Sequence, residues 1–162
     1  DFIDNTLNPL FKNKSKVIRV SIRGTEYAIQ KIVKDHYKPF DDVEAIKIIK
    51  ERMNEFGYEY IYLSTEQQEY YDAFQAEFGD KLIAMDRKRY LQKDVENLEF
   101  ALEKKFDRKN DRYFTGLDYI ADTEGLLRCD HIIGTLTNAF YYVIIRNFEL
   151  NNKLELIDKG LH

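Results

Sequence analysis

The sequence predicts an α/β fold, a three-layer Rossmann-like arrangement in which helices cover both faces of a parallel sheet. Short apolar segments with strand character alternate with longer segments whose apolar residues recur at helical spacing. Turn and capping residues separate them. The resulting order, β-α-β-α-β-α-α-β-α-β, favours parallel strands joined by right-handed crossovers. Because the chain has 162 residues, it can bury one core but not two large ones, so we expect one domain.

The chain opens with residues 1–16, which are polar and contain Pro9. We expect an entry segment or the end of a linker there, followed by the domain over residues 17–162. The first strand is predicted at residues 17–23, where apolar and polar residues alternate. Its faces would carry Ile18, Val20 and Ile22 on one side and Arg19, Ser21 and Arg23 on the other.

Further helices and strands follow by the same criteria. Asp41 with Glu44 is typical of a helix start and Gly57 of a helix end. Thr65 and Gln68 have the spacing of a capping box for the next helix, which should end at Gly79. Apolar spacing predicts an amphipathic helix within residues 86–116, with a loop at 107–112, and helices over 117–127 and around 140–144. Strands are expected at 60–63, 81–85, 131–133 and 154–157.

Composition excludes several classes of function. The net charge of −4 gives no general attraction for nucleic acid, and the sequence shows no membrane span and no signal peptide. The single cysteine, Cys129, excludes an internal disulfide and fits a reducing compartment. His36, His131 and His162 do not have metal-ligand spacing, so we expect neither a metal nor a cofactor. We expect a cytoplasmic protein. Because the chain begins at Asp1 without Met, we also expect further residues upstream.

Two segments near opposite ends of the chain carry the candidate chemistry. The first strand ends in Arg23-Gly24-Thr25-Glu26, and the fourth in Gly134-Thr135-Leu136-Thr137-Asn138. An arginine can donate paired hydrogen bonds to a phosphate, and a helix start with hydroxyl and amide donors binds anions. Since the carboxyl ends of parallel strands share one edge of a sheet, the two segments predict a site for a phosphorylated, nucleotide-linked ligand.

Each of these residues also has a purely structural interpretation. Arg23 can pair with Glu26 or another surface acid, and Thr137 can be a simple N-cap. Asp118, Asp122 and Glu124 lie on the helix before the fourth strand, where most acids are solvated. Capping explains Ser64-Thr65-Glu66 equally well. No Gly-rich dinucleotide fingerprint, P-loop or Gly-x-Ser-x-Gly elbow occurs.

Four blocks together resemble the donor-binding half of the GDP-fucose-dependent fucosyltransferases, the α1,6, α1,2 and protein-O-fucosyl superfamily. The likeness is to bacterial members found with surface-polysaccharide genes. The blocks are Ser21-Ile-Arg23-Gly-Thr-Glu26, His36-Tyr-Lys-Pro39, Leu63-Ser-Thr65-Glu66 and the stretch from Asp122 to Asn138.

The resemblance implies that residues 17–162 form a nucleotide-sugar-binding domain, one half of a two-domain GT-B glycosyltransferase. The implied enzyme transfers fucose from GDP-fucose to a glycan hydroxyl, with inversion and without a metal. The resemblance implies that Arg23 contacts the donor diphosphate and is needed for catalysis. It also implies that Asp122 recognises the hydrogen-bonding edge of guanine. The turn that contains Thr135, Thr137 and Asn138 would bind phosphate and ribose. Glu26 would be the base or would orient Arg23.

Some residues depart from the family pattern. Ser21 replaces a common histidine, Glu26 replaces the usual Asp, and Gly24 stands where a second arginine occurs. The acid proposed as the base in the α1,6 enzymes would fall near Lys31.

In the family the acceptor binds between two domains. We therefore expect an upstream acceptor-binding domain, and a chain that transfers little sugar alone. A cytoplasmic bacterial location leaves peripheral membrane association open. The alternative is a non-enzymatic α/β domain that binds a nucleotide or a protein.

Overall fold

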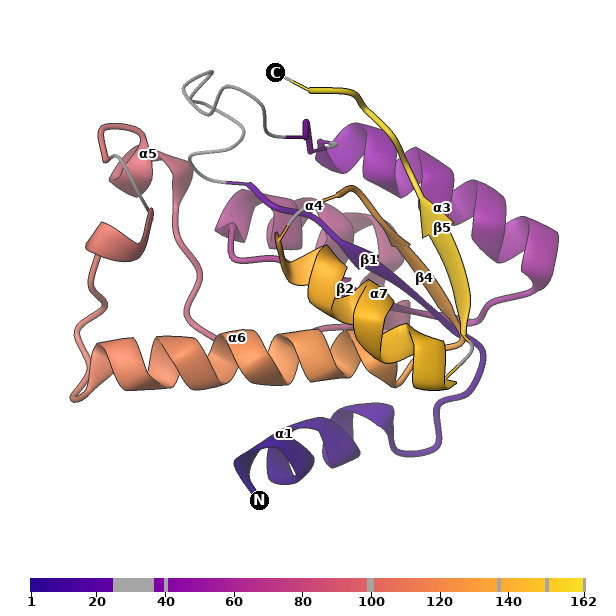
Figure 1. The fold of residues 1–162 in the computed structure, drawn as a ribbon, viewed down its shortest axis with the longest axis horizontal. Helices are drawn as coiled ribbons and strands as arrows, with labels where there is room; N and C mark the ends of the chain where they lie inside the picture. The colour runs from indigo at the N-terminus through magenta and orange to yellow at the C-terminus, as the bar shows by residue number, and fades with distance from the viewer. Residues whose placement is uncertain (25–36, 40, 99–100, 137, 151, 162) are drawn as a thin grey trace.

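Five parallel strands form the centre of the computed structural model, which describes residues 1–24, 37–39, 41–98, 101–136, 138–150 and 152–161 (Figure 1). The strand order is β3-β2-β1-β4-β5, and every neighbouring pair runs parallel. The strands are β1 Val17–Ser21, β2 Tyr60–Ser64, β3 Leu82–Ile83, β4 His131–Gly134 and β5 Lys153–Leu156. The predicted α/β class is therefore confirmed, and each predicted strand overlaps an observed one.

Helices lie on both faces of the sheet, as Figure 1 shows. Those that cover one face are α3 Asp42–Phe56 and α4 Gln68–Phe78. The other face is covered by α6 Asp111–Leu127 and α7 Asn138–Leu150, with α1 Phe2–Phe11 packed against α6. The shorter elements are η1 Gly79–Lys81, α5 Gln92–Val95 and η2 Ala101–Glu103.

The sheet buries apolar side chains on both faces. Ile18, Val20 and Ile22 pack against Ile49 of α3 and Phe74 of α4. The opposite face contributes to a second cluster, made of Val17, Tyr62, Ile83, Leu126, Leu127, Cys129, Ile132, Phe140 and Val143. The alternation predicted for the first strand is therefore present. Arg19, on the second face, is completely buried.

The predicted caps of α3 are confirmed, but those of α4 are only partly so. Asp41 Oδ1 accepts a hydrogen bond from Glu44 N at 2.8 Å, and α3 ends at Gly57 in the left-handed conformation. The capping box at Thr65 is wrong, because α4 begins at Gln68 with no side-chain cap. Thr65 is buried, and its Oγ1 instead accepts from Gln67 N at 3.2 Å. Gly79 follows α4 as expected.

The amphipathic helix expected within residues 86–116 is also wrong. Among the residues described there, the helical elements before α6 starts at Asp111 are the short α5 and η2. Tyr90 is held to the start of α4 by two backbone bonds, Tyr90 N to Glu66 O and Gln68 N to Tyr90 O. Tyr90, Val95 and Ala101 then form a small cluster of their own. The apolar residues with helical spacing therefore pack around Tyr90 instead of along one helix face.

Residues 1–16 contain a packed helix that their polar composition does not indicate. Leu7 of α1 is fully buried beside Met85 and Ala121. Arg128 donates to Asn8 Oδ1 at 2.6 Å and to Asp4 Oδ1 at 2.7 Å. This segment therefore contributes to the core under α6.

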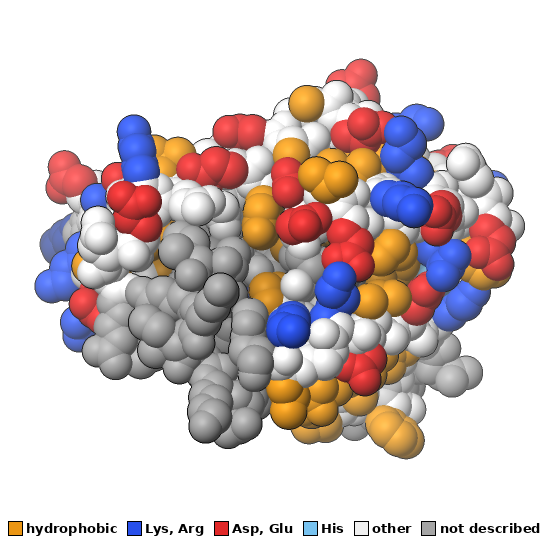
Figure 2. Space-filling view, turned by 90° about the horizontal axis from the view of Figure 1, so that it is seen from above, with side chains coloured by type: hydrophobic (Ala, Val, Ile, Leu, Met, Phe, Trp, Pro, Cys, Tyr) orange, Lys and Arg blue, Asp and Glu red, His pale blue; other side chains and the backbone are white. Residues whose placement is uncertain are grey.

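The outer surface of α7 is unusually apolar. Tyr141, Ile145 and Phe148 are exposed along one stripe of this helix, and Phe148 is 89% exposed. Figure 2 shows hydrophobic side chains gathered at the lower edge of that view. This edge is the side that faces the viewer in Figure 1, where α7 lies in front of the sheet. None of the helices in the described part of the chain is both long and apolar enough to cross a bilayer.

Candidate functional site

The two predicted turns meet at one edge of the sheet. Ser21 at the end of β1 is the register partner of Gly134 at the end of β4. Arg23 and Thr135 therefore follow neighbouring strands at the same edge. The strand order also reverses between β1 and β4, since β2 and β3 extend the sheet on one side and β4 and β5 on the other. Such a reversal creates the crevice in which open α/β sheets bind ligands.

Arg23 lies beside an acid at this edge. Its side chain is 25% exposed, and its Nε is 4.0 Å from Glu66 Oε1. Glu66 is therefore the acid with which Arg23 pairs, as the structural interpretation of Arg23 expects. Glu26 and Thr25 lie outside the described residues. Gly24 is buried against Gln67, whose side chain would overlap any Cβ added at position 24. Tight packing therefore explains this glycine without a ligand.

The second turn leads directly into α7. Gly134 lies under the Phe140 ring so closely that a Cβ there would overlap the ring. Thr135 is buried, and Asn138 is the first residue of α7. Thr137 is outside the described residues. The start of the 13-residue α7 thus follows the carboxyl end of β4, where helix amides and the helix dipole favour an anion.

Asp122 of α6 forms a buried hydrogen-bond network with the end of β2. Its Oδ1 accepts from Tyr62 Oη at 2.8 Å, and its Oδ2 accepts from Ser64 Oγ at 2.9 Å and from Arg87 Nη1 at 3.2 Å. Burial, followed by the charge of Asp122, raises the pKa of Tyr62 well above its ordinary value. Gly125 allows this approach, because a Cβ there would overlap the Tyr62 phenol. Asp122 is therefore not a solvated surface acid.

Two arginines that the sequence interpretation did not select lie beside Asp122. The Arg87 side chain is 6% exposed. Arg89 donates from Nη2 to Met85 O at 2.8 Å, and its guanidinium lies 4.2 Å from the centre of the Tyr71 ring. A signal was available, because the charged run Asp86-Arg-Lys-Arg89 directly follows the third predicted strand. We selected Arg23 because it stands at the end of a predicted strand. The same criterion applies to Arg87 and Arg89, which follow the third predicted strand.

Other polar residues singled out from the sequence have structural partners. Asp118 accepts from Arg108 Nη1 at 3.1 Å, and Glu124 accepts from Arg146 Nη1 at 3.2 Å. His131 is fully buried in β4, with the rings of Phe56 and Tyr58 5.8 and 5.6 Å away. Burial lowers its pKa. His36 and His162 lie outside the described residues, within which no group of three His, Cys, Asp or Glu could hold a metal ion.

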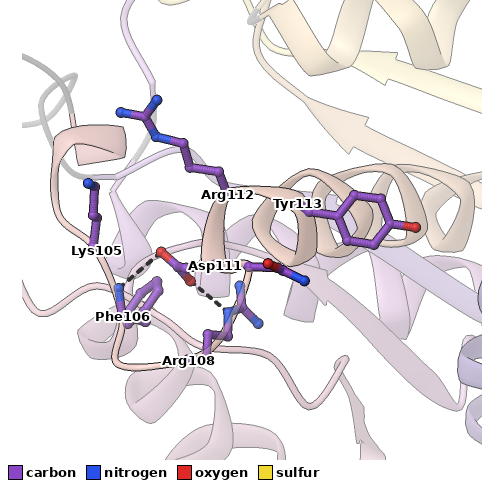
Figure 3. Close-up of a pocket in the computed structure, with 7 residues that line it drawn as sticks. Lys105, Phe106, Arg108, Asp111, Arg112 and Tyr113 are labelled. Carbon is purple, nitrogen blue, oxygen red and sulfur yellow. Dashed lines mark hydrogen bonds and ion pairs between the residues drawn. The ribbon is translucent and has the colours of Figure 1, made fainter.

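A cavity of about 820 Å³ lies at the start of α6, and none of the predicted site residues that the structure describes lines it. It is lined by Lys105, Phe106, Arg108, Asn110, Asp111, Arg112 and Tyr113. Asp111 accepts from Phe106 N at 3.1 Å and from Arg108 Nε at 2.6 Å. Figure 3 shows the side chains of Lys105 and Arg112 pointing away from the Asp111–Arg108 ion pair. The bonded residues serve mainly to fix the first turn of α6.

Comparisons with known proteins show a likeness in fold. No family model matches the sequence, and no curated protein does. The GDP complex of POFUT1, a GDP-fucose protein O-fucosyltransferase, matches with a TM-score of 0.54 at 10% identity, over 97% of this chain and 46% of that chain. The apo form of POFUT1 matches over the same shares, with a TM-score of 0.49 at 8% identity. The chain thus shares a Rossmann-like fold with the GDP complex and spans about half of its length.

Proposed function

We propose that this chain is the donor-binding domain of an inverting glycosyltransferase that transfers fucose from GDP-fucose, or a related nucleotide sugar, to a glycan hydroxyl. The supporting observation is the position of Arg23 and the turn at residues 134–138, which flank the reversal in strand order. The fold shared with the GDP complex of POFUT1 is consistent with this proposal. A GT-B arrangement, with the acceptor held by a second domain, completes it.

The proposed chemistry uses positive charge at the strand ends. The acceptor oxygen attacks the anomeric carbon of fucose while the bond from that carbon to the β-phosphate oxygen breaks. Negative charge then accumulates on the departing GDP. The Arg23 guanidinium and the amides that begin α7 would stabilise this charge, a role that a metal ion plays in other transferases. Glu26 would accept the acceptor proton, or would orient Arg23.

Titration calorimetry with GDP, GDP-fucose, GDP-mannose and UDP-sugars tests the proposal. We expect binding of GDP and GDP-fucose and much weaker binding of UDP-sugars. Equal affinity for all the nucleotides would contradict the guanine-specific form of the proposal. Failure of every nucleotide to bind would reject nucleotide binding altogether.

Arg23→Lys is expected to weaken GDP binding at least about tenfold while leaving thermal unfolding almost unchanged. Lysine keeps the charge but loses the planar pair of donors that matches a phosphate. Calorimetry gives the affinity and thermal denaturation the stability. Glu66→Gln is the matched control, because it removes the neighbouring acid and leaves the guanidinium in place. A large drop in melting temperature with unchanged GDP affinity would instead assign Arg23 to a salt bridge alone.

Asp122→Ala is expected to reduce the preference for GDP over UDP. Asp122 Oδ1 accepts a hydrogen bond from Tyr62 Oη, and a carboxylate oxygen can accept a second donor from the base edge. Guanine presents N1 and N2 donors side by side. Losing a buried bond of this kind costs about 1–3 kcal/mol, which corresponds to a change in preference of about 5-fold to 150-fold. An unchanged ratio of the GDP and UDP dissociation constants would contradict this role.

A non-enzymatic α/β domain that binds a nucleotide or a protein is the second candidate. It is favoured by Gly24, which packing against Gln67 accounts for, and by the internal partners of Asp122. Nucleotide binding without sugar transfer, measured with an acceptor-binding domain supplied, would support this candidate.

A further inference from the structure

The side chains of Arg87 and Arg89 lie close together where β3 ends. The Arg87 side chain is 6% exposed, and Arg89 is partly buried. Arg87 is bonded to Asp122, the buried carboxylate that Tyr62 and Ser64 also contact. Burial lowers the pKa of Arg89, and the charge of Arg87 lowers it further, whereas Asp122 and Asp86 act in the opposite direction. Asp86 is exposed, so the two guanidinium groups share one buried carboxylate.

Both arginines have a hydrogen-bond donor that is not used. The Nε atoms of Arg87 and Arg89 are buried, and neither has a hydrogen-bond partner among the residues that the structure describes. A buried donor without an acceptor costs free energy, and a buried charge without sufficient compensation costs more. A bound oxyanion would supply acceptors for the donors and compensate the excess positive charge.

The position of the two arginines connects them to Arg23. Asp122 links Arg87 to Ser64 at the end of β2, and Ser64 is the register partner of Ser21 at the end of β1. Arg23 follows two residues after Ser21, and its acid neighbour Glu66 follows two residues after Ser64. The ends of three adjacent strands therefore carry all three arginines to one edge of the sheet.

We infer that Arg87 and Arg89 form a second oxyanion-binding element at this edge, and that Asp122 is the positioning residue that holds Arg87. The ligand group is a phosphate, supplied by the diphosphate of the nucleotide. The inference rests on the proposed function, since it adds residues to the same site. The proposed function assigns the phosphate contact to Arg23 and the start of α7, whereas this inference adds Arg87 and Arg89, which follow β3.

The test is calorimetric titration of the whole chain with inorganic pyrophosphate, inorganic phosphate and GDP. Arg87→Met and Arg89→Met should each weaken pyrophosphate binding at least about tenfold, because each removes a charged donor pair. The matched control is Arg112→Met, which removes one exposed charge in the first turn of α6, about 15 Å along the helix from Asp122. The control should change affinity less than about twofold, as expected for a distant, screened charge.

Asp122→Asn separates positioning from simple electrostatics by the sign of its effect. Removing a negative charge beside the site would tighten pyrophosphate binding if Asp122 acted only through its charge. We expect weaker binding instead, because Arg87 loses the carboxylate that fixes it. Ser64→Ala, which removes one donor to the same carboxylate without changing any charge, should weaken binding in the same direction but less.

The possible outcomes also separate this inference from the proposed function. GDP binding that is unaffected by either arginine variant overturns the inference and leaves the proposed function intact. Pyrophosphate binding that depends on Arg87, without preference for GDP over UDP, supports the inference and contradicts guanine recognition. If Arg87→Met does not fold, Arg87→Lys should still weaken binding, and unchanged affinity would overturn the inference. Absence of pyrophosphate binding to the unmodified chain also overturns it.

Discussion

Arg19→Met is expected to stabilise the folded chain by about 1–4 kcal/mol. Arg19 lies in the central strand β1, beside its register partners Tyr62 and Ile132, and is completely buried. Within the described part of the chain, its Nε, Nη1 and Nη2 atoms are buried without hydrogen-bond partners. An unpaired buried charge is costly, and methionine is an unbranched apolar side chain that adapts to irregular space. The gain should therefore come from removing the charge while keeping most of the packing.

The stabilisation should depend on pH. Burial lowers the pKa of Arg19 from its ordinary value to about 9, although Cys129, Asp130 and Tyr62 act in the opposite direction. Below pH 9 the guanidinium carries its charge in the folded chain, and the cost is fully present. Above pH 9, and up to the ordinary pKa of an arginine, the unfolded chain binds more protons at this site than the folded one, so folding is progressively favoured there. The advantage of methionine should accordingly be largest near neutral pH and shrink above pH 9.

Urea denaturation of the two chains at pH 7 and at pH 10 measures both effects. Arg112→Met is the control, since an exposed arginine of α6 should change stability by less than about 0.5 kcal/mol. A lower stability of Arg19→Met at pH 7 would contradict the prediction. It would mean that the buried guanidinium stabilises the folded chain. A gain that did not change with pH would show that it comes from packing rather than from charge.

Arg19 also shows where sequence periodicity stops being informative. Alternation placed it correctly on one face with Ser21 and Arg23, and three polar residues on one face suggest a solvated surface. Both faces of this parallel sheet are covered, however, and α6 and α7 cover the face that carries Arg19. Periodicity thus predicts which residues share a face, whereas burial depends on helices that come more than ninety residues later.

The candidate site likewise contains residues that local sequence predicts and residues that only the tertiary fold brings together. Arg23 and the turn at residues 134–138 were predictable because strand ends and small residues are local features, and parallel topology brings such ends together. The contacts of Asp122 with Tyr62 and Ser64 span 60 and 58 residues, so no local pattern shows them. The expected helix over residues 86–116 concealed Arg87 and Arg89, because charges along a helix read as a solvated face. That error arose from Tyr90, whose bonds to the start of α4 compete with helix formation.

Residues 1–162 alone are expected to bind GDP-fucose yet transfer fucose at a rate close to the uncatalysed background. Under the proposed function, the acceptor hydroxyl is held in line with the donor carbon by a second domain. Such positioning can supply about 7–11 kcal/mol of the barrier reduction, so its loss would lower the rate by several orders of magnitude.

Release of GDP and formation of fucosylated product, measured with a panel of glycan acceptors, test this expectation. Calorimetric binding of GDP-fucose by the same preparation is the control, because it shows that the donor site is folded and occupied. Binding with background transfer agrees with a donor-binding domain that depends on an acceptor-binding partner. Robust transfer that Arg23→Lys abolishes would place the acceptor site within residues 1–162, and the division of the enzyme between two domains would have to be abandoned.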